Sequence, residues 1–110
     1  MISLIIATKD RAYLLEKVLD GFYNLELISE VIFVDDASDD NTGELIKKYS
    51  EKYPLIKTQY LRNKSRKGAP FSKRLGAMSA TSEYLLFCDD DEKIEPDYAK
   101  KCMDLLKHRL

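Results

Sequence analysis

The stretch that decides the fold is YLLFCDDDE, residues 84–92. Its first five residues are typical of a buried strand, and four acidic residues follow them directly. The same order occurs earlier, where VIFV at residues 31–34 leads into Asp35 and Asp36. Because ligands of open parallel sheets bind at the carboxyl ends of the strands, both acidic groups are expected in one crevice. Oxygen-rich sites of this kind suit Mg²⁺ or Mn²⁺, which relieve the repulsion between close carboxylates.

Strand-like and helix-like segments alternate along the whole chain. The expected strands cover residues 3–7, 30–34, 56–61 and 83–88. The expected helices cover residues 10–23, 39–53, 70–81 and 97–107. Asp10 and either Asp39 or Asp40 are suited to cap the first two helices, because short acidic side chains accept hydrogen bonds from helical N–H groups. Four successive strand–helix units predict an α/β protein with one parallel sheet, right-handed crossovers and helices on its faces.

Apolar spacing predicts which side of each helix is buried. The residues expected inside are Leu14, Leu15, Val18, Leu19 and Phe22 in the first helix, Leu45, Ile46 and Tyr49 in the second, Phe71, Leu75 and Met78 in the third, and Tyr98, Cys102, Leu105 and Leu106 in the last.

Length and composition indicate one small globular domain. The chain has 110 residues, of which 45% are hydrophobic and 34% charged. A net charge of −1 gives no support for nucleic acid as a partner. Cys88 and Cys102 have neither metal-site spacing nor a secreted disulfide pattern, which favours reduced thiols and a cytoplasmic location. No apolar stretch reaches the roughly 18 residues of a membrane span, so any membrane association would need a further region or a partner.

The two acidic segments each admit a plain interpretation and a functional one. Residues 35–42, DDASDDNT, suit a turn and a helix cap, which accounts for residues 38–42 but less well for acids directly after a buried strand. A carboxylate there, Asp36 above all, can accept from a nucleobase N–H or a ribose hydroxyl. The acidic run 89–92 suits a solvated turn before the last helix. Four adjacent acids repel one another, however, and this favours metal binding.

The basic segment also has two interpretations. Residues 62–68, RNKSRKG, followed by Lys73 and Arg74, form either a solvated loop or a group of cations that meets a pyrophosphate opposite the metal. No glycine-rich phosphate loop is present, which argues against dinucleotide oxidoreductases and ATPases. His108, the single histidine, is expected to be exposed and inert.

Three segments together resemble the family 2 glycosyltransferases of the GT-A fold: SLIIATKDR at 3–11, VIFVDDASDDNT at 31–42 and EYLLFCDDDE at 83–92. Their order and spacing match the nucleotide-binding half of that family across nearly the whole chain. The resemblance implies a three-layer, Rossmann-like sheet of about four parallel strands in the order 3-2-1-4. It also implies a donor that is a nucleotide-diphosphate sugar of the UDP or GDP type, bound with Mn²⁺ or Mg²⁺.

The resemblance assigns roles to single residues. Asp36 matches the acid that binds the nucleobase, Asp91 matches the metal ligand, and Asp89 matches the group that meets the ribose or supports the metal. The residues expected to bind the donor are Thr8, Arg11, Asp36, Gly68, Arg74, Asp89 and Asp90, and those expected at the metal are Asp91 and Asp89. Two departures concern donor identity, because Lys9 replaces a frequent aromatic residue and Leu75 replaces an asparagine.

The length of the chain limits the expected activity. A GT-A domain continues to an acceptor-binding half, so residues 1–110 are expected to be a single nucleotide-sugar-binding domain that is truncated before that half. No catalytic base or acceptor can be assigned, and the isolated chain is expected to be inactive and to form a homodimer through an open sheet edge beside the fourth strand. The alternatives are a naturally short relative, a non-catalytic nucleotide-binding module, a subunit that another segment or chain completes, and a nucleotidyltransferase-like enzyme.

Overall fold

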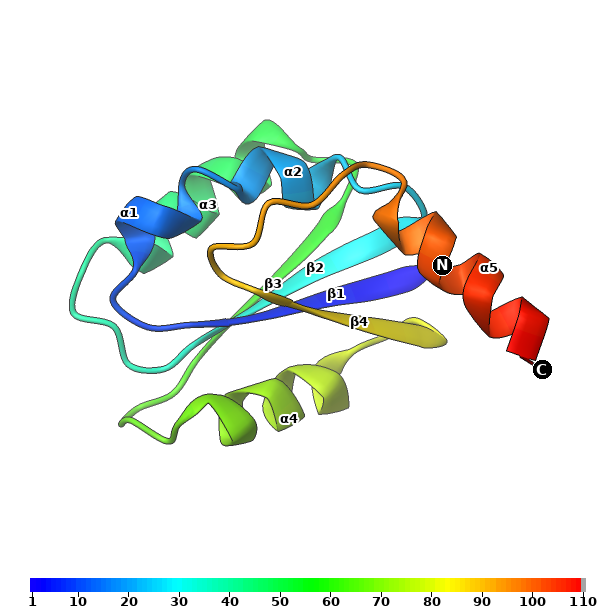
Figure 1. The fold of residues 1–110 in the computed structure, drawn as a ribbon. Helices are drawn as coiled ribbons and strands as arrows, with labels where there is room; N and C mark the ends of the chain where they lie inside the picture. Colours follow the sequence, from blue (N-terminus) through cyan, green and yellow to red (C-terminus); the bar gives the residue numbers. More distant parts are fainter. Residues whose placement is uncertain (110) are drawn as a thin grey trace.

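Four strands form one parallel sheet in the computed structural model, which describes residues 1–109 and the side chains of residues 1–107. The strands are β1 (Ile2–Thr8), β2 (Ile28–Asp35), β3 (Lys57–Arg62) and β4 (Tyr84–Asp89). Their order across the sheet is β3-β2-β1-β4, which confirms the predicted order 3-2-1-4. β1 therefore lies in the middle, and β4 forms one edge (Figure 1).

Helices cover both faces of the sheet, as the alternating pattern predicts. On one face lie α1 (Ala12–Leu15), α2 (Leu19–Tyr23) and α3 (Thr42–Lys52), and on the other lies α4 (Ala69–Ser79) (Figure 1). α5 (Tyr98–Arg109) leads away from the sheet beside the N-terminus. The three-layer α/β architecture is thus confirmed.

The two central strands are buried on both sides, as a parallel sheet requires. On the α1–α3 face the largest fully buried side chains include Phe22 and Phe33. On the α4 face the core is smaller and centres on Ile5, Ile32 and Val34. α4 approaches this face closely at Gly76, where an added Cβ atom would lie 2.6 Å from Ile5 Cγ2. Only glycine lets the helix backbone lie this near β1.

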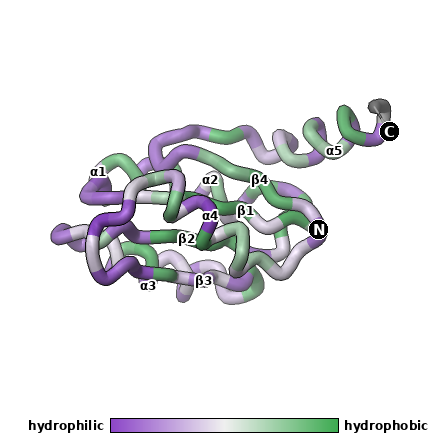
Figure 2. The backbone as a smooth tube through the Cα atoms, turned by 90° about the horizontal axis from the view of Figure 1, so that it is seen from below, coloured by the Kyte–Doolittle hydropathy of each residue, from purple (hydrophilic) through white to green (hydrophobic). Residues whose placement is uncertain are grey.

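Hydrophilic residues gather in the loops at the end of the sheet opposite the N-terminus (Figure 2). This is the end at which the parallel strands finish. The register explains the gathering, since Thr8 pairs with Asp35 across β1 and β2, and Ala7 pairs with Asp89 across β1 and β4. The two acidic strand ends therefore lie on either side of the end of β1.

The prediction of one continuous helix over residues 10–23 is wrong. α1 ends at Leu15, and beyond its C-cap the N–H groups of Lys17 and Val18 bond three residues back instead of four, Lys17 to Leu14 and Val18 to Leu15. This tighter turn separates α1 from α2. It still buries Leu15 and Val18, so the predicted apolar face is largely kept.

The predicted capping roles of Asp10 and Asp39 are also wrong. Asp10 has a φ of 51°, and its carboxylate accepts from the backbone N–H groups of Asp39 at 2.6 Å and Asp40 at 3.3 Å. Asp40 accepts from Thr42 N at 3.1 Å at the start of α3. Of the two candidates, Asp40 serves the helix start.

Some predicted core positions are exposed. Phe71 and Met78 are 48% and 73% exposed, whereas Leu75, the third residue predicted inside on this helix, packs inward as expected. On α5 the inward residues are Ala99 and Met103, whereas Tyr98, Leu105 and Leu106 are exposed. The side chain of His108 lies outside the described residues. Among the helices that the structure describes, none is both long and apolar enough to cross a membrane.

A buried carboxylate fastens the opposite end of the sheet. Glu30 is 1% exposed and accepts hydrogen bonds from the Ser3 hydroxyl, the Gln59 amide, and both the backbone N–H and the hydroxyl of Thr81. Burial would raise the pKa of Glu30, but these four donors outweigh it and lower the pKa to about 2. The ionised form therefore belongs to the folded state.

Glu30→Gln should destabilise the fold by about 3 kcal/mol. The NH2 group of the new side-chain amide would face hydrogen-bond donors, and it cannot accept a hydrogen bond from them. Since the folded pKa lies below the ordinary value of 4.5, the contribution of Glu30 is full above pH 4.5 and is lost as the pH falls toward 2. Denaturant unfolding between pH 7 and pH 3 measures both effects. Exposed Glu51→Gln is the control, and equal loss of stability in the two variants would contradict this role of Glu30.

Candidate functional site at the carboxyl edge of the sheet

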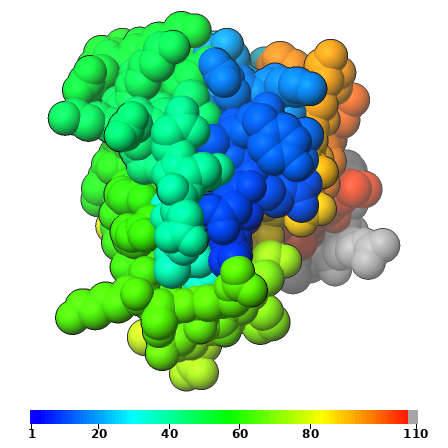
Figure 3. Space-filling model, turned by 90° about the vertical axis from the view of Figure 1, so that its left-hand side faces the viewer, coloured from blue at the N-terminus to red at the C-terminus, as the bar shows by residue number. Residues whose placement is uncertain are grey.

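The end of β1 joins the two acidic strand ends. The carbonyl oxygen of Thr8 accepts from the backbone N–H of Asp36 at 2.9 Å. Its hydroxyl donates to Asp90 Oδ2, also at 2.9 Å. Thr8 is 4% exposed, so both bonds are shielded from water. Figure 3 looks onto this edge, where the blue end of β1, the cyan segment after β2, the green loop before α4 and the gold segment after β4 meet.

Asp36 holds the basic loop that follows β3. Its Oδ1 accepts from the Asn63 side-chain amide at 3.0 Å and from Lys67 N at 2.7 Å, and its Oδ2 accepts from Gly68 N at 2.9 Å. Burial would raise the pKa of Asp36, but the hydrogen bonds from Lys67, Asn63 and Gly68 outweigh it and lower the pKa below its ordinary value. The carboxylate is thus ionised and only 5% exposed.

Gly68 permits the turn from this loop into α4. Its φ is 92°, in the region that side-chain-bearing residues rarely adopt. The same residue is the N-cap of α4 and donates to Asp36. Gly68 therefore lies in the predicted site, and the loop conformation requires a glycine at this position.

Asp35, next to Asp36, has a different role. Its carboxylate is fully buried and accepts from Ser38 N at 2.9 Å, from the Tyr60 hydroxyl and from Arg62 Nη1 at 3.1 Å. These partners fasten the turn after β2 to the edge strand β3. The plain interpretation of the acidic stretch thus holds for Asp35.

Asp90 is the buried member of the acidic turn after β4. Burial raises the pKa of Asp90, and the hydrogen bond from Thr8 and the charge of Arg11 only partly offset this effect. Arg11 Nε lies 3.4 Å from Asp90 Oδ1, and Arg11 Nη2 lies 2.8 Å from Asp91 Oδ2. Asp89 and Asp91 are exposed. A single guanidinium thus faces two of the three aspartates.

The residues at this edge line a cavity of about 340 Å³. The lining residues are Ala7, Thr8, Lys9, Arg11, Asp36, Arg66, Gly68, Ala69, Ser72 and Asp90. Five of the predicted donor-binding residues are in this set. A cavity of this volume is at the lower end of the range for small-molecule sites, and it combines a few apolar walls with groups of both charges.

Three predicted residues lie outside the cavity lining. Asp89 and Asp91 are in the acidic turn at its border. Arg74 lies elsewhere, in a shallow hollow on α4 with Phe71, Leu75 and Met78. The structure therefore does not bring Arg74 into the cavity, and its role toward a donor stays a prediction.

Sequence reasoning missed two buried polar residues of the site. Asn63 is 6% exposed, and its side-chain amide donates to Asp36 and, at 3.0 Å, to the hydroxyl of Ser72. Ser72 lies on α4 and is fully buried. The available signal was an uncharged asparagine inside a basic run, which a solvated loop does not need.

The acidic turn fits a divalent cation only as a partial ligand set. Within residues 1–107, no three side chains of His, Cys, Asp or Glu converge in the manner of a complete metal site. Mg²⁺ and Mn²⁺ are nevertheless commonly held by one or two carboxylates together with substrate phosphates. The exposed carboxylates of Asp91 and Asp89 supply that chemistry.

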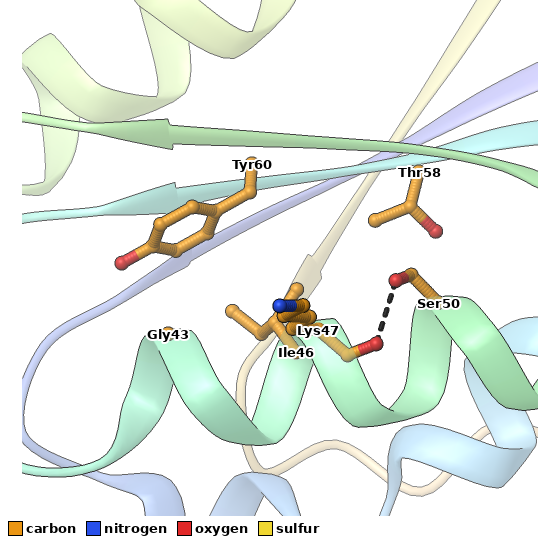
Figure 4. A pocket seen from close by; sticks show the side chains of 6 residues that line it. All are labelled: Gly43, Ile46, Lys47, Ser50, Thr58 and Tyr60. Atoms are coloured by element: carbon orange, nitrogen blue, oxygen red, sulfur yellow. Dashed lines mark hydrogen bonds between the residues drawn. The ribbon is translucent and has the colours of Figure 1, made fainter.

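A second cavity, of about 370 Å³, lies between α3 and β3 (Figure 4). Its hydroxyl groups already have partners: Tyr60 donates to Asp35, Thr58 bonds to Tyr23, and Ser50 donates to the carbonyl oxygen of Lys47. It contains no carboxylate and lies away from the acidic turn. This hollow therefore offers little for ligand recognition.

Known proteins match this architecture. A model of the family described as glycosyl transferase family 2 matches residues 3–109. The chain belongs to this family. The resemblance inferred from the three sequence segments is thereby confirmed, and the family match covers every residue that lines the cavity.

Two kinds of relative illustrate the similarity. The cholesterol galactosyltransferase of Borreliella burgdorferi is 32% identical over 95 residues, which cover 86% of this chain and 26% of that protein. The structure of mannosyltransferase PcManGT from Pyrobaculum calidifontis, in complex with GDP-Man and Mn²⁺, superposes with a TM-score of 0.88 at 25% identity over 96% of this chain and 32% of that one.

S. aureus TarS 1–349 in complex with UDP-GlcNAc shares the fold, with a TM-score of 0.84 at 22% identity over 97% of this chain and 31% of that one. This chain thus spans about a third or less of the length of these relatives.

Proposed function

We propose that this chain binds a nucleoside-diphosphate sugar at the carboxyl edge of its sheet, as the donor-binding part of a glycosyltransferase that passes the sugar to an acceptor. The observation that carries the proposal is the cavity in which the carboxylates of Asp36 and Asp90 face the cations of Lys9, Arg11 and Arg66. A nucleoside diphosphate has donors on its base and ribose and negative charge on its phosphates. The cavity offers complementary groups for each.

Asp36 is suited to accept from the nucleobase. An ionised carboxylate has about four acceptor positions, and the loop uses three of them. Because Oδ1 accepts two of these bonds and Oδ2 only one, a position on Oδ2 is left for an N–H of the base. The lowered pKa of Asp36 keeps this acceptor ionised at neutral pH.

The cations of the cavity are suited to the diphosphate. Arg66 lines the cavity, is exposed, and has no carboxylate partner among the described residues. Lys9 is paired with Asp10 at 3.3 Å. Arginine binds phosphate through two parallel N–H groups, so Arg66 has the better chemistry for this contact.

The acidic turn is suited to share a divalent cation with that diphosphate. Asp91, supported by Asp89, would hold the ion, with Mn²⁺ or Mg²⁺ as the fitting ions. When bound, the cation would neutralise the negative charge that develops on the departing diphosphate. The complexes of relatives with GDP-Man and Mn²⁺ and with UDP-GlcNAc support a donor of the GDP or UDP type.

We place this reaction in the cytoplasm, because Cys88 and Cys102 are both free thiols and suit a reducing compartment.

Nucleoside diphosphate should bind well only in the presence of the cation, because Asp91 and the phosphates share it. Calorimetry with UDP and with GDP should show tight binding in Mn²⁺ and about a tenfold or greater loss in EDTA or in Asp91→Ala. Asp97→Ala is the matched control, since the side chains of Asp91 and Asp97 are both 48% exposed but Asp97 pairs with Lys101 on α5. Equal binding in EDTA and in Mn²⁺ would overturn the metal-assisted site.

Asp36→Asn should weaken nucleotide binding about tenfold, because an amide oxygen replaces a charged acceptor and one side of the group now donates. Asp39→Asn should leave the affinity unchanged, since the Asp39 carboxylate is exposed and makes no hydrogen bond among the described side chains. Titration calorimetry in Mn²⁺ compares the two variants. If both bind nucleotide alike, Asp36 does not recognise the base.

A second candidate is a nucleotide-binding module without transfer activity of its own. Exposed apolar side chains on the edge strand β4 favour such a module, one that packs against a further segment or chain. At the sheet edge, Leu85 and Phe87 of β4 are 41% and 46% exposed, which is where further chain could pack. The homodimer predicted through this edge stays a prediction.

The purified 110-residue chain should bind the donor yet transfer little sugar, because transfer needs a base within hydrogen-bond reach of the acceptor hydroxyl. Radiolabelled UDP- and GDP-sugars with simple acceptors test this, with donor binding measured in parallel. Robust transfer that is abolished by Glu92→Gln or Glu95→Gln would contradict the expectation and make the chain a minimal transferase.

A further inference from the structure

The guanidinium of Arg11 occupies the position between the cavity and the acidic turn. Its side chain is 41% exposed and comes from the loop directly after β1. Nη2 donates to Asp91 Oδ2 at 2.8 Å, while Nε faces Asp90 Oδ1 at 3.4 Å without forming a hydrogen bond. The same arginine lines the cavity. It therefore touches both of the places that the proposed function gives to the cation and to the diphosphate.

The contacts of Arg11 are unequal. Asp91 is exposed, so its bond to Nη2 competes with water and is weak. Nε is buried and lies 3.4 Å from Asp90 Oδ1 without a hydrogen bond among the described residues, so its charge is paired but its N–H is not satisfied. Asp90 already accepts from Thr8, so it is held without Arg11. Breaking the bond between Arg11 and Asp91 therefore costs little free energy. A new acceptor that forms a hydrogen bond with Nε would stabilise the displaced arginine.

We propose that Arg11 is a displaceable counterion of the acidic turn, which competes with a divalent cation for Asp91 and binds the donor's diphosphate once it is displaced. This inference rests on the proposed function, because it assumes that Asp91 holds the cation. A phosphate oxygen is the acceptor that Nε lacks, and a diphosphate can take two parallel N–H bonds from one guanidinium. Cation binding and diphosphate binding thus assist each other through a single side chain.

The proposal predicts a specific pattern of cation affinity. In the absence of nucleotide, Arg11→Gln should bind Mn²⁺ about fivefold more tightly than the native chain, because the competitor for Asp91 is gone. With UDP or GDP present, the native chain should gain more Mn²⁺ affinity than Arg11→Gln does, since only the native chain has a guanidinium to transfer to the diphosphate.

Lys9→Gln is the matched control. Lys9 lies in the same loop, lines the same cavity and carries the same charge, but it pairs with Asp10 and not with the acidic turn. A general electrostatic effect would raise Mn²⁺ affinity alike in Arg11→Gln and Lys9→Gln. Displacement raises it mainly in Arg11→Gln. Arg11→Lys retains the charge without the two-pronged donor, so it should compete with Mn²⁺ yet show the smaller gain with nucleotide.

Electron paramagnetic resonance of free Mn²⁺, with and without UDP or GDP, measures these affinities, and thermal unfolding verifies that each variant is folded. The expected result is tighter Mn²⁺ binding in Arg11→Gln alone, with a smaller gain on adding nucleotide. If the native chain binds Mn²⁺ and nucleotide but Arg11→Gln matches it, or matches Lys9→Gln, the counterion role is overturned and the proposed function stands. If the native chain binds neither, the proposed function fails and this inference fails with it.

Discussion

The two hydrogen bonds of Thr8 organise the functional edge of this fold. Its carbonyl oxygen accepts from Asp36 N and its hydroxyl donates to Asp90, so one residue fastens both acidic strand ends. This is possible because β1 lies between β2 and β4 and all three strands run the same way. Asp36 in turn positions the basic loop, because its carboxylate accepts hydrogen bonds from Lys67 N and Gly68 N. The cavity is the space that these connections enclose.

The acidic residues divide into those that accept hydrogen bonds from backbone N–H groups and those whose carboxylates are exposed. Asp35 and Asp40 accept from neighbouring N–H groups and close local turns. Asp36 does the same and also lines the cavity. Asp89 and Asp91 are exposed, and Asp91 pairs with Arg11. Neighbouring carboxylates in each acidic segment thus have different roles, and their hydrogen-bond partners distinguish these roles.

Local sequence was sufficient for the strands and the strand-end position of Asp36, since a buried strand that ends in acids has few alternatives in a parallel sheet, whereas the strand order came from the family resemblance. It was insufficient where contacts join distant segments. The carboxylate of Asp10 reaches Asp39, 29 residues away, instead of capping its own helix. Phe71 and Met78 have helical spacing, yet α4 packs through Leu75 and Gly76 because the sheet must approach its backbone. Asn63 was missed because its partners, Asp36 and Ser72, come from different elements.

The central claim is that this edge is a nucleoside-diphosphate site, and the amide NMR spectrum tests it most directly. On addition of UDP or GDP with diamagnetic Mg²⁺, the largest shift changes should fall at residues 8–11, 36, 66–69 and 89–91. The amides of Lys67 and Gly68 report on Asp36 in particular, because their hydrogen bonds end on its carboxylate. Shifts concentrated at Gly43, Lys47 and Thr58, which line the cavity between α3 and β3, or no shifts at all, would contradict the account.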